Sequence, residues 1–333
     1  MNGLKKYGMI MITMILVLAI PLQAAGLKKV GQAGMKWMSI PIGARGAALG
    51  NAYTAIANDV SSMFWNPAGL AFTKGIHVFA NRTQWIADIN MNSAALSYNA
   101  GDWGVFGLSY VSMDWGTLHG TQRANIGKGY IETGDFSPVD WTVGLNYARK
   151  VSNSFSFGGH VHYISENLGT TYEGSFTEPV KYTAKMNLFS FDFGTYYFTG
   201  FKDLRLAMTL QNFSQEKEYR LEHFSLPLMF KFGAAMDILK FWTDSKLHTL
   251  TLSIDAVHPR DFSERMHFGL EYIYNKMFFL RSGYKYNYDE ENLSFGAGLV
   301  YNIHSLTVTI DYSYIMFKNL GNVQMFSFDF SLD

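Results

Sequence analysis

The chain contains 333 residues, with 27 basic and 27 acidic side chains and a formal net charge of zero, so it offers no basic footprint for a nucleic-acid partner. It contains no cysteine, which excludes disulfides and thiolate metal sites. Charged residues make up only 16% of the chain and aromatic residues another 16%, with a mean hydropathy of −0.01, whereas about a quarter of the residues in an ordinary soluble protein are charged.

The first residues predict export. Lys5 and Lys6 form a positive amino-terminal region, and an uncharged apolar run follows at 9–20. Ala24 then supplies the small residue that signal peptidases prefer. The apolar run is shorter than the roughly 20 residues that a membrane-spanning helix needs. We therefore predict a cleaved signal peptide over residues 1–25, with a retained membrane anchor as the alternative.

Residues 42–72 predict a compact, partly helical segment. Four apolar side chains recur three and four residues apart, as on one face of a helix: Leu49, Ala52, Tyr53 and Ile56. Asp59 and Ser61 are candidate N-caps for a second short helical turn. Pro67 disfavours helix at Asn66, so a turn is expected there. A helix packed on a soluble sheet is the alternative interpretation.

About fourteen strands follow. The predicted ranges are 76–86, 88–98, 102–114, 138–150, 153–166, 184–199, 202–213, 223–237, 246–258, 262–275, 277–287, 291–302, 304–316 and 323–332. Apolar and polar side chains alternate along the later ones, for example Leu250, Leu252 and Ile254 against Thr251, Ser253 and Asp255. No stretch after the signal is apolar enough for a helical span, and a β-barrel needs only every second residue to face lipid.

A soluble sandwich shows the same alternation, but two further features favour a barrel. Several tyrosines lie near predicted strand ends, as in the interfacial girdles of membrane barrels: Tyr272, Tyr274, Tyr284, Tyr286, Tyr301, Tyr312 and Tyr314. Tight turns alternate with long links at 115–137, 167–183 and 213–222, although the connection at 238–245 is longer than this alternation predicts. An even strand number places both strand termini at one end, so the amino-terminal plug should enter from the periplasm.

Residues 59–71 resemble the plug signature of FadL-type outer-membrane barrels, and residues 42–53 are similar to the PorV/PorQ branch of that superfamily. The resemblance implies an all-β transmembrane antiparallel barrel of about 14 strands with an amino-terminal helical plug in the lumen. It implies a plug at 26–74, a barrel at 75–333, and localisation in the outer membrane. Asn66, Pro67 and Ala68 match the family's Asn-Pro-Ala segment.

The same resemblance leaves three functions open. FadL-type proteins move hydrophobic small molecules across the outer membrane. PorV-type proteins serve type IX secretion, in which they bind secreted cargo proteins and carry them to a surface sortase. A structural or adhesive barrel without substrate is the third possibility. Outer-membrane lipid is an expected partner in each case, and the mixed aromatic and charged links at 115–137 and 167–183 suit either partner binding or simple solvation.

For transport, an apolar pocket between plug and wall should be lined by Tyr53, Ile56, Phe64 and Trp65, beside Asn66, Pro67 and Ala68. Polar residues opposite the lipid face should point into the lumen, where they hold the plug, line a polar path or form internal salt bridges. The charged candidates are Arg205, Lys231, Asp255, Glu271, Arg281, Lys285, Asp311 and Asp329.

Catalysis and cofactors are not predicted. The motifs G-x-S-x-G, H-E-x-x-H and G-x-x-x-x-G-K-[ST] do not occur, although a serine and histidine paired across strands would leave no such motif. His160 and His162 share one face of a strand, but the sequence does not identify further ligands, so no metal site is predicted.

Overall fold

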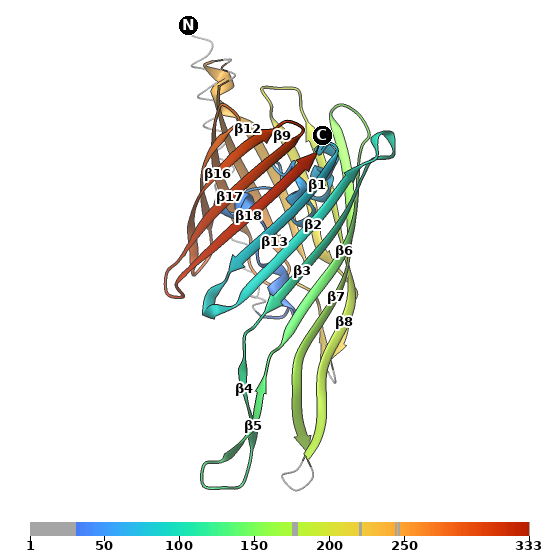
Figure 1. Ribbon diagram of the computed structural model, residues 1–333, viewed down its shortest axis with the longest axis vertical. Coiled ribbons are helices and arrows are strands. Elements are labelled where there is room, and N and C mark those ends of the chain that lie inside the picture. The colour runs from blue at the N-terminus through green and yellow to red at the C-terminus, as the bar shows by residue number, and fades with distance from the viewer. Residues whose placement is uncertain (1–30, 175–178, 220–221, 244, 246, 333) are drawn as a thin grey trace.

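The computed structural model describes residues 31–174, 179–219, 222–243, 245 and 247–332 (Figure 1). Within this part of the chain, fourteen strands close into one antiparallel barrel. They are β1 (Ile76–Gln84), β2 (Asn90–Asn99), β3 (Val105–Asp114), β6 (Val139–Lys150), β7 (Phe155–Gly174), β8 (Pro179–Phe198), β9 (Arg205–Phe213), β12 (Met229–Asp237), β13 (His248–Pro259), β14 (Arg265–Tyr274), β15 (Phe278–Tyr286), β16 (Glu291–Ile303), β17 (Leu306–Phe317) and β18 (Asn322–Leu332). β1 pairs with β18 to close the barrel, with Ile76 opposite Leu332. The predicted fold class and strand number are confirmed.

Most large apolar side chains of the strands face outward, although a few, such as Met91 and Met325, are buried against the plug side. On β18, Phe326, Phe328 and Phe330 are 41%, 39% and 41% exposed, whereas Ser327 between them is 3% exposed. β13 follows the same rule, because Ser253 and Asp255 face the interior and are fully buried. An apolar outer face around a polar, occupied interior is the arrangement of a transmembrane barrel. No helix in the described ranges reaches the length and apolarity needed to span a membrane.

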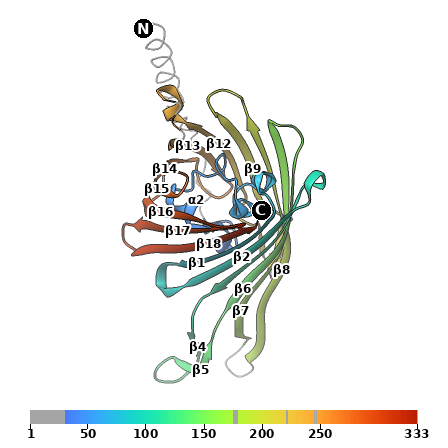
Figure 2. The same cartoon turned by 45° about the horizontal axis from the view of Figure 1, so that its top comes forward.

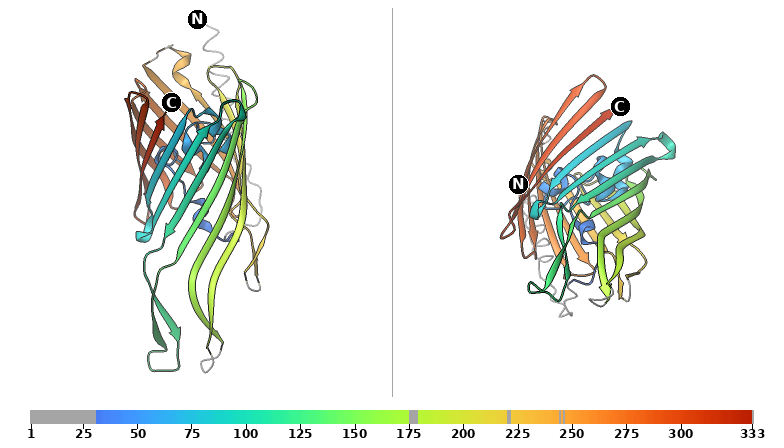
Figure 3. Two further views of the ribbon diagram at one scale, coloured as in Figure 1. Left: turned by 45° about the vertical axis from the view of Figure 1, so that its right-hand side comes forward. Right: turned by 60° about the horizontal axis from the view of Figure 1, so that its bottom comes forward.

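The two ends of the barrel differ in their connections. Tight turns and the end of β18 lie at one end, and two projections extend from the other (Figures 1 and 3). One projection is the hairpin of β4 (Leu118–Arg123) and β5 (Tyr130–Phe136). The other is the β7–β8 pair. A second small hairpin joins β10 (Lys217–Tyr219) to β11 (Glu222–Phe224).

One predicted connection is wrong, and the long connection noted at 238–245 agrees with the structure. The predicted link at 167–183 is largely strand, because β7 and β8 pair again from Thr170 and Thr183 after a register shift at Asn167. The connection after β12 contains the 3-10 helix η6 (Ile238–Phe241), in which the Asp237 side chain accepts a hydrogen bond from the Leu239 N–H. This capped turn explains why residues 238–245 are longer than a tight turn.

The plug segment precedes β1 and lies inside the barrel (Figure 2). It contains η1 (Lys36–Ser39), α2 (Ala44–Ala48), η2 (Val60–Phe64) and η3 (Pro67–Phe72); the short turns η4 (Ile86–Asp88) and η5 (Gly101–Trp103) lie between barrel strands. Asp59 caps η2 by accepting from the Ser61 N–H, and Asn66 caps η3 with Pro67 in its first turn. The cap at Asp59 and the turn at Asn66 agree with the predictions.

The predicted helical face from Leu49 to Ile56 is wrong, because α2 ends at Ala48. Gly50 and Asn51 adopt left-handed backbone angles, with φ of 63° and 66°, which terminate a helix. Gly50 also lies against β15, where a Cβ atom would come within 2.7 Å of the Tyr284 nitrogen. Contact with the barrel wall therefore overrides local helical spacing in this segment.

Candidate functional site

Glycines of the barrel wall allow the plug backbone to approach closely. A Cβ atom on Gly283 would lie 1.9 Å from the Gly50 nitrogen, and one on Gly158 would lie 2.5 Å from the Pro67 carbonyl carbon. Gly194 likewise leaves room for Asn66, whose Oδ1 a Cβ atom would approach to 2.0 Å. No larger residue fits these positions without displacing the plug.

Asn66 connects plug and wall through its amide. Nδ2 donates to the carbonyls of Thr54 (3.0 Å) and Thr195 (3.1 Å), while Oδ1 accepts from the Ala68 N–H (3.2 Å). A carboxylate of the wall plays a similar part, because Asp255 Oδ2 accepts from the N–H groups of Tyr53 (3.1 Å) and Thr54 (3.0 Å). These bonds satisfy backbone groups that a helix would otherwise have satisfied.

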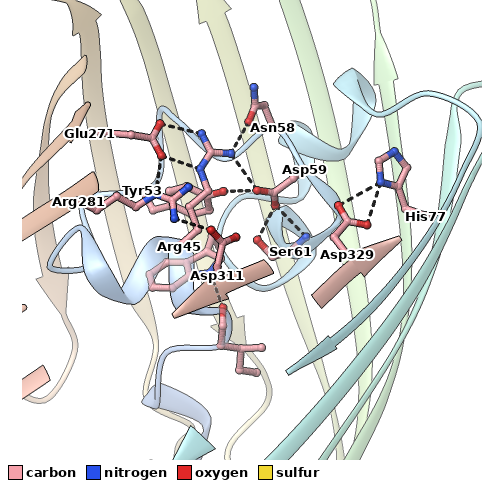
Figure 4. Close-up of polar contacts among 12 residues, drawn as sticks. Arg45, Tyr53, Asn58, Asp59, Ser61, His77, Glu271, Arg281, Asp311 and Asp329 are labelled. Atoms are coloured by element: carbon pink, nitrogen blue, oxygen red, sulfur yellow. Dashed lines mark hydrogen bonds and ion pairs between the residues drawn. The ribbon is translucent and has the colours of Figure 1, made fainter. Parts of the chain in front are cut away.

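A charge network fastens the middle of the plug to the wall (Figure 4). The Arg45 guanidinium donates to both carboxylate oxygens of Glu271 (3.0 and 2.9 Å) and to Asp59 Oδ2 (2.9 Å). Glu271 also accepts from Arg281 Nε (2.7 Å), and Arg281 donates to Asp311 (2.5 Å). Two cations and three carboxylates thus form one chain of contacts from α2 to β14, β15 and β17.

Burial and charge shift the pKa values of the plug groups in this network. Burial alone raises the pKa of Asp59, but Arg45 and hydrogen bonds from Ser61 and Tyr53 outweigh burial and hold that pKa below its ordinary value. Burial is the main reason that the pKa of Tyr53 lies well above its ordinary value, although Arg45 opposes it. Tyr53 therefore stays protonated, and its hydroxyl donates a 2.5 Å hydrogen bond to Asp59 Oδ2.

A cavity of about 300 Å³ lies between the start of the plug and the wall, toward the end with the projecting hairpins. Part of its lining is apolar, and these side chains belong to one packed cluster: Trp37, Met38, Ile40, Phe64, Met91 and Val111. The polar lining residues include His162, Asp192, Gln211, Lys231, His267 and Lys285. A mainly apolar cavity with a few convergent polar groups is the usual form of a small-molecule site.

Residues 36–42, which precede α2, form part of the cavity lining. Gly34 donates its N–H to the Ser225 carbonyl (3.0 Å), and Lys36 Nζ lies 2.7 Å from Asp261 Oδ2. Trp37 Nε1 donates to Glu166 Oε2 on β7 (3.1 Å). The described plug therefore begins at the end with the projecting hairpins and runs through the lumen to the opposite end, where β1 begins. Residues 31–75 thus do not follow the prediction that the plug enters from the end where the strand termini lie.

The predicted ligand residues occupy two different places. Phe64 and Trp65 line the cavity. Tyr53, Ile56 and Ala68 belong instead to the buried core between plug and wall, and Asn66 and Pro67 are also buried beside it. The ligand-binding role of all seven residues remains a prediction. Sequence reasoning did not identify Trp37, Met38 and Ile40, which precede the segment that resembles FadL-type plugs.

The predicted lumen charges also divide into groups. Glu271, Arg281 and Asp311 belong to the Arg45 network, and Asp255 binds plug backbone. Lys285 pairs with Glu291 at the cavity. Lys231 extends over the ring of Trp65, with Nζ 5.3 Å from the ring centroid. The two remaining residues are Arg205, half-buried near the start of β9 beside Tyr196, and Asp329, paired with His77 (3.1 Å).

Comparisons with known proteins match this architecture. A model of an uncharacterised protein family (UPF0164) matches residues 14–175, less than half of the chain, and no curated protein sequence matches it significantly. Among solved structures, the CymD monoaromatic hydrocarbon channel is similar with a TM-score of 0.57 and 11% identity, over 88% of this chain and 97% of that one. The Ralstonia pickettii toluene transporter TbuX gives 0.53 and 14% identity, over 86% and 96% of the two chains. A Pseudomonas aeruginosa FadL homologue gives 0.52 and 12%, over 88% and 99%.

At these identities the likeness establishes a shared fold, the FadL-type barrel. The comparisons do not support the narrower resemblance to PorV and PorQ. Two of these structures carry names of hydrocarbon channels or transporters, and none of the three is named as an enzyme; the absence of enzymatic activity in this chain remains a prediction.

Proposed function

We propose that the protein is an outer-membrane transporter that admits a hydrophobic small molecule through the cavity beside η1. The observation that carries this proposal is the cavity itself: about 300 Å³, lined by tryptophan, methionine and aliphatic side chains inside a barrel whose exterior is apolar. The names of similar barrels, a monoaromatic hydrocarbon channel and a toluene transporter, support the same substrate class.

The arrangement of cavity and plug explains how a hydrophobic solute would be bound and why it would not pass freely through the barrel. A hydrophobic solute entering from the end with the projecting hairpins meets apolar walls that favour its removal from water. Phe64 and Trp65 of the plug line the cavity. Onward passage requires the plug to shift, and the Arg45 network and Asn66 set the free energy of that shift.

We also propose that the chain is exported, loses a signal peptide and is inserted in the outer membrane. Residues 1–25 act as a cleaved signal peptide, residues 26–74 form the plug and residues 75–333 form the barrel. Outer-membrane lipid then covers the exposed Phe326, Phe328 and Phe330 and their counterparts on other strands.

A secretion role of the PorV/PorQ type is the second candidate. It is supported by the resemblance of residues 42–53 and by the β4–β5 hairpin and β7–β8 pair, which project far enough to contact cargo or a sortase (Figure 3). A structural or adhesive barrel would use the same projections without any solute. Replacing residues 118–136 by a short turn separates these roles from transport, since it removes the β4–β5 projection and leaves the cavity lining intact.

Dye uptake tests transport directly. Cells that carry the protein in an intact outer membrane are mixed with the apolar fluorophore N-phenylnaphthylamine, and the rise in fluorescence is timed. We expect faster uptake than in cells without the protein, and slow uptake when Val111→Trp fills the cavity. Tyr110→Trp is the matched control, because Tyr110 lies on the same strand but is 45% exposed on the lipid side, whereas Val111 is 2% exposed. Equal uptake by both variants and by cells lacking the protein would refute the proposal.

A further inference from the structure

The pairing of β7 with β8 brings together three metal-binding side chains that are far apart in sequence. His160 and His162 project from the same face of β7, two residues apart, and Asp192 lies directly opposite His160 on β8. The three side chains are almost completely buried, with exposures of 1%, 6% and 4%. Their potential ligand atoms all lie within 4.8 Å of one another.

The distances suit a single ion. Asp192 Oδ2 lies 2.8 Å from His162 Nε2 and 3.9 Å from His160 Nδ1. Nitrogen and oxygen ligands bind zinc at about 2.0–2.2 Å, so two ligand atoms on one ion lie about 3 to 4 Å apart. The imidazole ring centroids are 3.8 Å apart, so both rings are already gathered at one point.

The protein does not satisfy both ring nitrogens of His162. Nε2 faces Asp192 Oδ2 at 2.8 Å, whereas Nδ1 is buried and has no hydrogen-bond partner among the described residues. His160 has an oxygen neighbour at each ring nitrogen, Met63 O at Nδ1 (2.9 Å) and Ser109 Oγ at Nε2 (3.0 Å). Whichever nitrogen of His160 binds an ion, the other still has an acceptor for its N–H, which is the usual way a ligating histidine is oriented.

The carboxylate is oriented too, because Asp192 Oδ1 accepts from the Asn212 N–H at 2.7 Å and leaves Oδ2 directed at the histidines. His162 and Asp192 also line the cavity beside η1. An ion held here would therefore have an open coordination position toward the cavity.

We propose that His160, His162 and Asp192 form a binding site for one divalent first-row transition metal ion, with zinc as the representative ion. Two imidazoles and one carboxylate select such ions over calcium and magnesium, which prefer all-oxygen ligands. Metal binding here does not depend on the proposed transport function, although His162 and Asp192 also line the transport cavity. It would tie β7 to β8 next to the plug at Met63.

Titration calorimetry of the mature protein in detergent, purified without a histidine tag and stripped with chelator, tests the site. We expect one Zn²⁺ per chain, and at least a ~10-fold loss of affinity in His162→Gln and in Asp192→Asn. Co²⁺ should give visible absorption bands that disappear in both variants. His258→Gln is the matched control, because His258 is on the exterior with a side chain 65% exposed, and it should bind zinc as the parent does.

His162→Gln keeps the test decisive if Asp192→Asn fails to fold, and faster migration of unheated than of heated samples on gels reports barrel folding in each variant. Absence of saturable Zn²⁺ binding in the folded parent protein would overturn the proposal. Equal zinc affinity in the parent and in a folded His162→Gln variant would overturn it as well.

Discussion

Replacing Arg45 by methionine should loosen the plug without unfolding the barrel. Arg45 contributes four side-chain hydrogen bonds: two to Glu271, one to Asp59 and one to Asn58. Methionine retains apolar bulk but leaves the Glu271 and Asp59 carboxylates with fewer partners.

The magnitude follows from what remains in the network. Removing one partner of a buried ion pair costs about 3–5 kcal/mol. Glu271 keeps Arg281 at 2.7 Å, and Asp59 keeps Tyr53 and Ser61 at 2.5 Å each, so the lower end applies. A change of about 3 kcal/mol corresponds to roughly a 100-fold increase in the population of released plug, at about 1.4 kcal/mol per factor of ten.

Cysteine labelling measures this population, because the parent chain contains no cysteine. Ser62 is fully buried in η2, and Ser62→Cys introduces a nearly isosteric thiol that a maleimide reaches only when the plug is released. Arg45→Met in this background should accelerate labelling about 100-fold. Arg82→Met, which removes an exposed arginine from the outer wall, should leave the rate unchanged. A rate for Arg45→Met within about threefold of the parent would refute the reasoning, since it corresponds to less than about 1 kcal/mol.

Two further predictions concern the wall and the β4–β5 hairpin. Gly158→Ala places a methyl group 2.5 Å from the Pro67 carbonyl carbon and should destabilise the docked plug by about 1–3 kcal/mol. Gly159→Ala is the control, because its methyl group lies 3.7 Å from the nearest atom, and it should leave the rate in the same labelling assay unchanged. Equal effects of the two variants would contradict the close approach of plug and wall at Gly158. Hydrogen bonding to Asp135 (2.6 Å) raises the pKa of His119. The protonated histidine therefore stabilises the ordered hairpin fully at pH values below the ordinary histidine pKa. This stabilisation is lost as the pH rises through the raised pKa of His119. Histidine NMR titration in detergent should show the raised pKa and its return to the ordinary value in Asp135→Asn; an identical pKa in both proteins would disprove the pairing.

Much of the fold was predictable because strand period and turn spacing are local signals. The alternation of apolar and polar residues along 250–256 predicted that Ser253 and Asp255 point into the barrel, and both side chains are fully buried there. The helix expected from Leu49 to Ile56 failed for a nonlocal reason: Asp255, some 200 positions later, supplies the acceptor for the Tyr53 and Thr54 N–H groups. Helical spacing alone contains no information about such a partner.

The site was less predictable than the fold. Phe64 and Trp65 were identified from the plug motif, but Trp37 lies upstream of that motif and is held at the cavity by contacts with residues far away in sequence, among them a hydrogen bond to Glu166 on β7. Asp192 was missed as a neighbour of His160 because their pairing depends on the register of β7 and β8. A hairpin register worked out from the facing residues of these two strands would have placed Asp192 beside the histidines.

Binding of an apolar fluorophore to the purified protein in detergent tests most directly whether the cavity beside η1 receives a hydrophobic molecule. Energy transfer from tryptophan to N-phenylnaphthylamine reports occupancy, since Trp37, Trp65 and Trp85 line the cavity. We expect saturable binding to the parent and to Tyr110→Trp, and at least a ~10-fold weaker affinity in Val111→Trp, which is about 1.4 kcal/mol of lost binding free energy. The same affinity in all three proteins would contradict this expectation.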